Sequence, residues 1–128
     1  MIKIINLTLA LLLASTSIYA ADFPDISVDD LQKAISSKKV AVIDVNGPKS
    51  FANGHIPGAI DFSAGKEKLT SLLPKNKDTL VVAYCGGPSC RAYLRGANAA
   101  AALGYTNIRH LSAGISGWKK AGQKLAKK

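Results

Sequence analysis

The sequence predicts an α/β fold in three layers, with a parallel sheet flanked by helices on both faces. Two observations point to this class. Short runs rich in β-branched apolar residues, at 40–45, 79–84 and 107–111, are typical of strands that are buried on both faces. These runs alternate with segments of helical pattern, and such alternation produces parallel sheets whose connecting helices cover both faces.

The first half of the expected domain begins with a helix over 26–39, where Ser27 can cap the helix and Asp30 occupies the capping-box position. After the first strand, segment 46–60 is dense in glycine, proline and asparagine, so we expect it to be mostly loop. A short helix that Pro74 stops should precede the second strand.

The second half supplies an alanine-rich helix over 90–105, which Gly104 should end, and a final helix over 113–128. We find no internal repeat and no low-complexity linker. The chain of 128 residues suits one domain, which we place at 21–128, with a basic C-terminal helix and tail.

Residues 1–20 have the order of a secretory signal peptide: a positive charge at Lys3, a mostly apolar run at 4–13, and small residues at the end. We expect cleavage after Ala20 and a periplasmic or secreted protein. A retained membrane anchor is the less favoured alternative, because the apolar run is shorter than the roughly 20 residues that a spanning helix needs.

The formal net charge is +9, and much of it is concentrated near the C-terminus. Five lysines lie in the last ten residues: Lys119, Lys120, Lys124, Lys127 and Lys128. We expect a solvated basic surface, with weak contact to an anionic membrane surface, an acidic partner or an anionic substrate as the alternative. Nucleic acid is not an expected partner, since the chain has few aromatic residues and no nucleic-acid-binding motif. A monomer is expected for so small a domain.

Both cysteines of the chain, Cys85 and Cys90, lie in the segment YCGGPSCRAY. Cys85 directly follows the strand expected at 79–84, and in parallel sheets ligands bind beyond this carboxyl end of the strands. Glycines let backbone amides approach an anion, and amides at the start of a helix favour a thiolate. Cys85 is therefore the candidate nucleophile. The candidate substrate-binding residues are those that follow it: Gly86, Gly87, Pro88, Ser89, Cys90 and Arg91.

Two other interpretations of the cysteines compete with a reactive thiol. A metal site is disfavoured because two cysteines give only two ligands and the two histidines, His55 and His110, lie in separate segments. No metal or cofactor is therefore expected. A structural disulfide is compatible with export, but it would close a loop of only a few residues and constrain the unfolded chain little. A bridge between Cys85 and Cys90 makes more sense as a reversible redox state of a reactive cysteine.

Three segments, in register, resemble the rhodanese family: VIDVNGPKSFANGHIPGAIDF at 42–62, VVAYCGGPSCRA at 81–92 and ALGYTNIRHLSAGISGWKKAG at 102–122. The likeness covers essentially the whole expected domain. It implies a rhodanese-like fold and sulfurtransferase activity.

In this resemblance, Cys85 matches the cysteine that takes a sulfane sulfur from a donor such as thiosulfate. It would become a persulfide and pass the sulfur to cyanide or a thiol. The loop amides would stabilise the negative charge on the outer sulfur. Arg91, and Arg95 one helical turn later, would hold the oxyanion end of the donor.

The loop departs from the usual family pattern, because five residues rather than four separate Cys85 from Arg91. This spacing resembles the cysteine phosphatases and their arsenate-reducing relatives. Ala92 stands where those enzymes commonly place Ser or Thr, and Pro88 removes one amide from the cradle. A phosphatase or oxyanion reductase therefore stays an alternative, as does a binding module without catalysis.

Cys90 is a candidate resolving thiol: it could attack a persulfide or an oxidised form at Cys85, releasing sulfide and forming a disulfide. The alternative is a buried residue without chemistry. Many family members carry Arg where Asn46 stands and Glu where Ser50 stands. Asp44, at the end of the first strand, is a candidate supporting residue that we expect to hydrogen-bond the following turn.

Four other conspicuous side chains are expected to be structural. His55 in the GHIPG motif should fix a turn through its ring, and His110 lies in a short strand. Trp118 should pack in the core. Tyr84 should pack beneath the cysteine loop rather than contact substrate.

Overall fold

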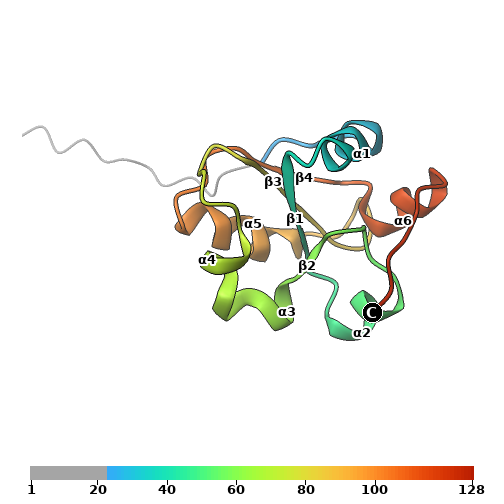
Figure 1. Cartoon of the computed structure of the whole chain (residues 1–128). Helices are drawn as coiled ribbons and strands as arrows, with labels where there is room; N and C mark the ends of the chain where they lie inside the picture. Colours follow the sequence, from blue (N-terminus) through green and yellow to red (C-terminus); the bar gives the residue numbers. More distant parts are fainter. Residues whose placement is uncertain (1–22) are drawn as a thin grey trace, which may run out of the picture.

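The computed structural model describes residues 23–128 (Figure 1). The expected signal peptide and its cleavage after Ala20 lie outside these residues and stay predictions. Within 23–128, no helix has the length and apolar character needed to cross a membrane.

The described residues form one four-stranded sheet, in which all strands are parallel and the order is β2-β1-β3-β4. The strands are β1 (Val40–Asp44), β2 (Ile60–Asp61), β3 (Leu80–Tyr84) and β4 (Ile108–His110). The central strands β1 and β3 pair along their whole length, and this register places Asp44 beside Tyr84. The parallel sheet and its three main strands are confirmed.

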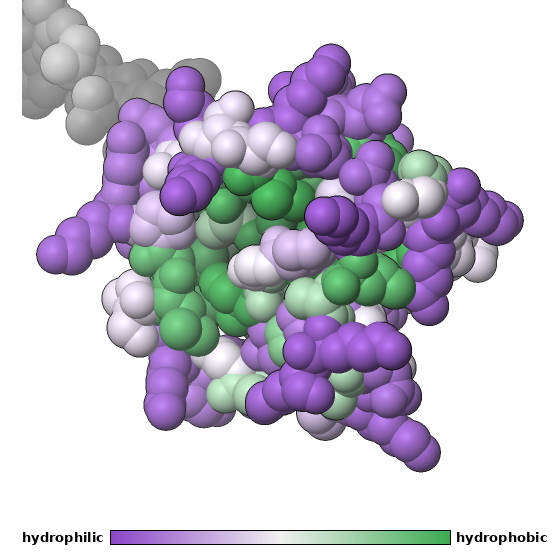
Figure 2. All heavy atoms as spheres, turned by 45° about the vertical axis from the view of Figure 1, so that its right-hand side comes forward, coloured by the Kyte–Doolittle hydropathy of each residue, from purple (hydrophilic) through white to green (hydrophobic). Residues whose placement is uncertain are grey.

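Helices cover both faces of this sheet (Figure 1). One face carries α1 (Val28–Ser36) and α6 (Gly114–Lys120); the other carries α5 (Tyr93–Ala102), α3 (Phe62–Gly65), the 3-10 turn η1 (Lys66–Lys68) and α4 (Leu69–Leu72). Short α2 (Pro48–Asn53) lies between β1 and β2. Each face buries its own apolar cluster, so the predicted three-layer architecture is confirmed. On the side of the molecule shown in Figure 2, hydrophilic side chains surround the rim and hydrophobic ones lie towards the middle.

Successive side chains of β3 point to opposite faces of the sheet, as strand geometry requires. Val82 and Tyr84 join the cluster beneath α1 and α6. Val81, Ala83 and Cys85 join the cluster beneath α5 and α4. Tyr84 and Cys85 are neighbours in sequence, but their side chains therefore pack on opposite faces of the sheet.

Two expected helix boundaries are confirmed: the start of α1 and the end of α5. The side chain of Ser27 caps α1 by accepting the Asp30 N–H at 3.1 Å. Gly104, with φ of +95°, follows the end of α5, where the left-handed conformation favours glycine. However, α5 begins at Tyr93 rather than at Cys90. The segment between β3 and α5, residues 85–92, is called the cysteine loop below. It is longer than predicted, and both cysteines lie in it, before the helix.

Segment 46–60 is less irregular than predicted, since it contains α2 and ends at the first residue of β2. Pro48 starts α2, where the missing N–H of proline costs no hydrogen bond, and Phe51 anchors the helix in the core. These six helical residues carry too little periodic pattern to reveal a helix among loop-forming residues.

The predicted final helix is wrong in its extent, because α6 stops at Lys120. Gly122 has φ of +75° and turns the chain back. The last residues then pair with the GHIPG segment: the amides and carbonyls of His55 and Ala126 exchange two hydrogen bonds of 2.9 Å. The C-terminus is thus held by backbone pairing and is not a helical tail.

Candidate functional site

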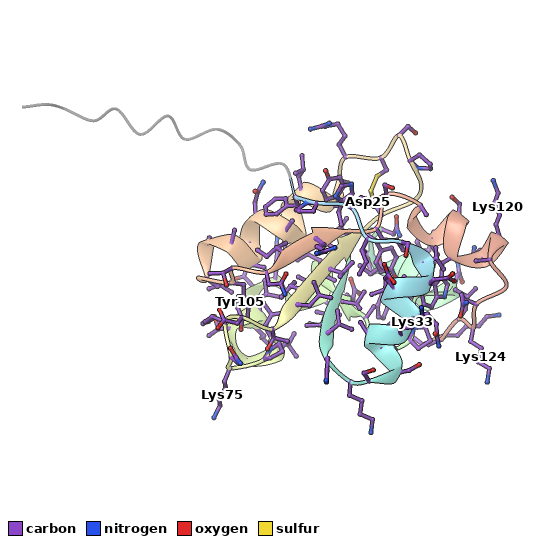
Figure 3. All side chains as sticks on the ribbon, turned by 90° about the horizontal axis from the view of Figure 1, so that it is seen from above. Asp25, Lys33, Lys75, Tyr105, Lys120 and Lys124 are labelled. Carbon is purple, nitrogen blue, oxygen red and sulfur yellow. A yellow bond between two sulfur atoms is a disulfide. The ribbon has the colours of Figure 1, made fainter. Side chains whose placement is uncertain are left out.

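Cys85 is the first residue after β3, at the carboxyl end of the sheet. Its side chain is only 3% exposed and packs in the α5-side cluster. Figure 3 shows the disulfide of this loop, drawn in yellow, at the end of the sheet opposite Lys75 and Tyr105. Cys85 therefore lies where the sequence placed it, at the edge of the sheet where parallel α/β folds bind ligands, and its role as the nucleophile stays a prediction.

The start of α6 fastens the first half of the cysteine loop. The Ile115 N–H donates to the Cys85 carbonyl at 2.9 Å, and the Ser116 N–H donates to the Gly86 carbonyl at 3.0 Å. Gly114 permits this approach: a Cβ there would lie 2.5 Å from both the Gly86 carbonyl carbon and the Gly87 nitrogen. The carbonyls of this half-loop are turned toward α6, which holds the backbone of Cys85 in place.

The second half of the loop is a tight turn that carries Cys90 back to Cys85. The Cys90 N–H donates to the Gly87 carbonyl at 3.0 Å, with Pro88 and Ser89 between them. Pro88 suits this turn because its ring fixes φ. The two cysteines form a disulfide with a Cα–Cα distance of 6.2 Å, so the site is in its oxidised form (Figure 3).

Several amides of the loop are available to an anion. Within residues 23–128, six N–H groups of the loop 85–92 donate to no protein acceptor: those of Cys85, Gly86, Gly87, Ser89, Arg91 and Ala92. Pro88 has no N–H to offer. The loop thus has the donor-rich backbone that anion binding requires.

The two arginines predicted to hold a substrate oxyanion, Arg91 and Arg95, are both exposed. Neither lines the cleft beside the loop. Arg91 precedes α5 and Arg95 lies in its first turn, so both belong to the segment that leads from the loop into this helix.

A polar cleft of about 320 Å³ adjoins the loop at Gly86. Its walls come from the β1–α2 connection, α2 and α6: Asn46, Ser50, Asn53, Ile115 and Lys119. Lys119 is the one charged side chain among the cleft residues described by the structure. Asn46 and Ser50 leave this wall uncharged. A second cavity, of about 400 Å³, lies between α1 and the C-terminal segment, and no residue of the cysteine loop lines it.

Asp44 is 1% exposed and both of its carboxylate oxygens accept hydrogen bonds. The Asn46 N–H donates to Oδ1 at 2.7 Å, which is the predicted turn contact, and the Tyr84 hydroxyl donates to Oδ2 at 2.5 Å. Burial raises the pKa of Asp44 above its usual range, while these two hydrogen bonds oppose the rise. Asp44 thus supports the cleft indirectly, by holding Asn46.

Tyr84 is fully buried, as predicted, and its hydroxyl also accepts the Ile56 N–H at 3.0 Å. Burial, together with the hydrogen bond to Asp44, raises the pKa of the Tyr84 phenol. Tyr84 therefore links β3, β1 and the GHIPG segment and faces away from the sulfur of Cys85.

The remaining predicted structural residues behave as expected. The Nδ1 atom of His55 lies 2.7 Å from the Phe51 carbonyl, and its ring stacks on Phe51. The Nδ1 atom of His110 lies 2.8 Å from the Phe23 carbonyl. Trp118 is buried and its Nε1 donates to the Lys124 carbonyl at 2.8 Å. In the described part of the chain, His, Cys, Asp and Glu form no group of three or more that could hold a metal.

Two residues of this region were missed by sequence reasoning: Gly114, which lets the loop approach α6, and Lys119, which lines the cleft. A signal for Lys119 exists, since Ile115 and Lys119 are four residues apart on one helix and must share a face. The role of Gly114 depends on a contact between distant segments, which no local pattern reveals.

Comparison with known proteins identifies the family. Residues 27–121 match the rhodanese-like domain. The chain is 30% identical over 104 residues to the thiosulfate sulfurtransferase GlpE of Shewanella oneidensis, covering 79% of this chain and 97% of that protein. It is also 30% identical over 99 residues to the dual specificity phosphatase Cdc25 of Arabidopsis thaliana, covering 69% of this chain and 67% of that protein.

Solved structures show the same fold. The human single-domain sulfurtransferase TSTD1 superposes with a TM-score of 0.61 at 23% identity, covering 77% of this chain and 97% of that one. A rhodanese-related protein from Thermoplasma volcanium superposes with a TM-score of 0.62 at 24% identity, covering 83% of this chain and all of that one. Because the family match covers residues 27–121 and the fold is the same, this chain belongs to the rhodanese-like family.

Proposed function

We propose that this chain is a sulfurtransferase that carries a sulfane sulfur on Cys85, with thiosulfate as a donor. The observation that carries the proposal is the setting of Cys85: a cysteine at the carboxyl end of a parallel sheet, followed by a loop whose amides are free to bind an anion. The family and the GlpE relative support the same activity.

The reaction requires the reduced form of the loop. In the disulfide the sulfur of Cys85 is bonded to that of Cys90, so it cannot act as a thiolate nucleophile. After reduction, the Cys85 thiolate attacks the outer sulfur of thiosulfate. A new S–S bond forms, the S–S bond of thiosulfate breaks, and sulfite leaves with the bonding electrons. The loop amides then stabilise the negative outer sulfur of the persulfide until cyanide or a thiol removes that sulfur.

Sulfur loading is tested by intact mass after reduction, removal of the reductant and addition of thiosulfate. We expect the Cys90→Ser variant to gain one sulfur atom and to release one equivalent of sulfite. Cys90 is replaced so that no second thiol in the loop competes for the sulfur. The matched control, which adds Cys85→Ser, should gain nothing; sulfur uptake by that double variant, or none by Cys90→Ser, contradicts the proposal.

A second candidate, a phosphatase or oxyanion reductase, is favoured by the five residues between Cys85 and Arg91 and by the Arabidopsis relative. The same reduced protein should therefore also be offered a small aryl phosphate. Turnover that depends on Cys85, without sulfur uptake from thiosulfate, would favour this candidate over sulfur transfer.

Lys119 gives the adjoining cleft a positive charge, and we propose that it attracts the anionic end of the donor. We expect Lys119→Gln to slow sulfite release from thiosulfate by about threefold at low salt, a size typical of one exposed charge. The difference should shrink as salt screens the charge.

The matched control is Lys120→Gln, which removes the same charge from the next residue, whose side chain points outward in Figure 3. It should load sulfur at nearly the wild-type rate. An equal slowing in both variants would show that only the overall charge of this surface matters and would overturn the assignment of Lys119.

A further inference from the structure

We propose that Cys90 discharges the Cys85 persulfide inside the loop, so that the protein releases the acquired sulfur as sulfide and ends as the Cys85–Cys90 disulfide. The inference rests on the proposed formation of the persulfide. It adds a second activity: the two-electron reduction of a sulfane sulfur to sulfide, with the loop dithiol as the reductant.

The first argument is reach. The sulfurs of Cys85 and Cys90 are bonded in the structure, and the Cα–Cα distance of 6.2 Å lies within the usual range for disulfides. The turn that returns Cys90 to Cys85 is closed by one local hydrogen bond, from the Cys90 N–H to the Gly87 carbonyl. Because a local hydrogen bond closes this turn and Pro88 restricts it, the dithiol form should keep Cys90 near its target.

The second argument is the division of roles between the two ends of the loop. The Cys85 end is fixed, since its carbonyl accepts the Ile115 N–H and its side chain is buried in the core. Cys90 is half-buried and lies before the start of α5, outside any helix or strand. A persulfide on Cys85 would thus be held in place, while Cys90 lies on a turn that belongs to no helix or strand.

The third argument is that the disulfide is poorly placed to stabilise the fold. It spans a sequence separation of five residues, so it restricts the unfolded chain little. Cys85 is buried in one apolar cluster through its own side chain, Cys90 only packs against that cluster, and the rest of the core comes from the two clusters and the paired central strands. A reversible chemical role accounts for the bridge better than a structural one.

The step balances as follows in atoms and electrons. The Cys90 thiolate attacks the inner sulfur of the persulfide, which is the Sγ atom of Cys85. The Cys85–Cys90 bond forms and the bond to the outer sulfur breaks. The outer sulfur takes the electron pair and one proton, equivalent to the one that the Cys90 thiol gave up on ionising, and leaves as hydrosulfide. The two cysteine thiols are oxidised by two electrons, and the sulfane sulfur is reduced by two. Regeneration requires a dithiol reductant, which reopens the bridge by thiol–disulfide exchange.

A single-turnover experiment without any external thiol tests the inference. Full-length protein is reduced, freed of reductant and mixed with one equivalent of thiosulfate, and sulfite, sulfide and intact mass are followed. We expect the wild type to release one equivalent each of sulfite and sulfide and to lose two hydrogens without keeping sulfur. Cys90→Ser and Cys90→Ala should release sulfite, retain one sulfur atom, and release sulfide at least about a hundredfold more slowly.

The outcomes separate this inference from the proposed function. A wild type that keeps the sulfur atom as stably as Cys90→Ser overturns the discharge step and leaves the persulfide intact. Failure of both Cys90 variants, shown to be folded by circular dichroism, to take up sulfur overturns the persulfide and the discharge with it. Sulfide release from Cys90→Ser at the wild-type rate would show that water or another group, and not Cys90, discharges the sulfur.

Discussion

Replacing Gly114 by alanine is expected to lower the free energy of unfolding by about 3 kcal/mol, through strain at φ of +61° and through forced displacement of backbone. The new Cβ would lie 2.5 Å from the Gly86 carbonyl carbon and from the Gly87 nitrogen. Neither is the flexible end of a side chain, so the cysteine loop or α6 must move. The hydrogen bonds from Ile115 and Ser116 resist that movement, because they tie both parts together at this point.

Gly122→Ala is the matched control for this prediction. Gly122 also has a positive φ, of +75°, but a Cβ there would meet nothing within 4 Å. Its loss should therefore be limited to backbone strain, about 1 kcal/mol. Urea unfolding of both variants measures the difference, and equal losses would contradict the steric argument.

Gly114→Ala should slow sulfur loading by more than its loss of stability explains. Displacing Gly86 and Gly87 moves two of the free loop amides and the carbonyl end of Cys85. At a temperature where Gly114→Ala is fully folded, we expect its sulfur loading to be slower than that of Gly122→Ala. This comparison separates loop geometry from global unfolding.

The parts of the fold that were predicted correctly are those in which local pattern and tertiary environment agree. Strand β3 is continuous, apolar and β-branched, and it is buried on both faces. Helix α1 carries its own cap at Ser27. Strand β2, with two residues, has no pattern of its own and exists only because Ile60 and Asp61 pair with β1. The C-terminal residues have good helix formers, yet pairing between Ala126 and His55 outweighs that propensity.

The candidate site divides in the same way. The position of Cys85 was predictable, because the end of a buried strand in an α/β fold identifies the ligand-binding edge. The cleft beside it was not, because its walls combine Asn46 with Lys119, which are far apart in the sequence. The opposite orientations of Tyr84 and Cys85 follow from strand alternation alone, once their strand is known to be buried on both sides.

Tyr84→Phe is expected to destabilise the domain by about 2–4 kcal/mol near neutral pH. The substitution removes only one oxygen, but that oxygen makes two buried contacts. It donates to the Asp44 carboxylate and accepts the Ile56 N–H. Its loss leaves the Asp44 Oδ2 atom and the Ile56 N–H without another hydrogen-bond partner among the described residues. The cost is greater when Asp44 is ionised, because the unpaired oxygen then carries charge.

The cost of Tyr84→Phe should also depend on pH, in a direction set by Asp44. Because burial raises the folded-state pKa of Asp44 above its unfolded value near 3.9, the stability that Asp44 contributes is complete below that value and is lost as pH rises through the folded pKa. The Tyr84 hydroxyl lowers this pKa, so removing the hydroxyl raises it further. In Tyr84→Phe the loss of stability should therefore be larger and extend to higher pH.

Urea unfolding from pH 4 to pH 8, for wild type and Tyr84→Phe, each with and without Asp44→Asn, measures this coupling. The gap between wild type and Tyr84→Phe should widen as pH rises and then level off. In the Asp44→Asn background the gap should be constant, because no carboxylate is left to titrate, and the contacts that the hydroxyl makes with the introduced amide and with the Ile56 N–H do not change their charge over this pH range. A pH-independent gap in both backgrounds would mean that the Tyr84 hydroxyl contributes through the Ile56 N–H and not through the carboxylate, and that Asp44 and Tyr84 are not energetically coupled across β1 and β3.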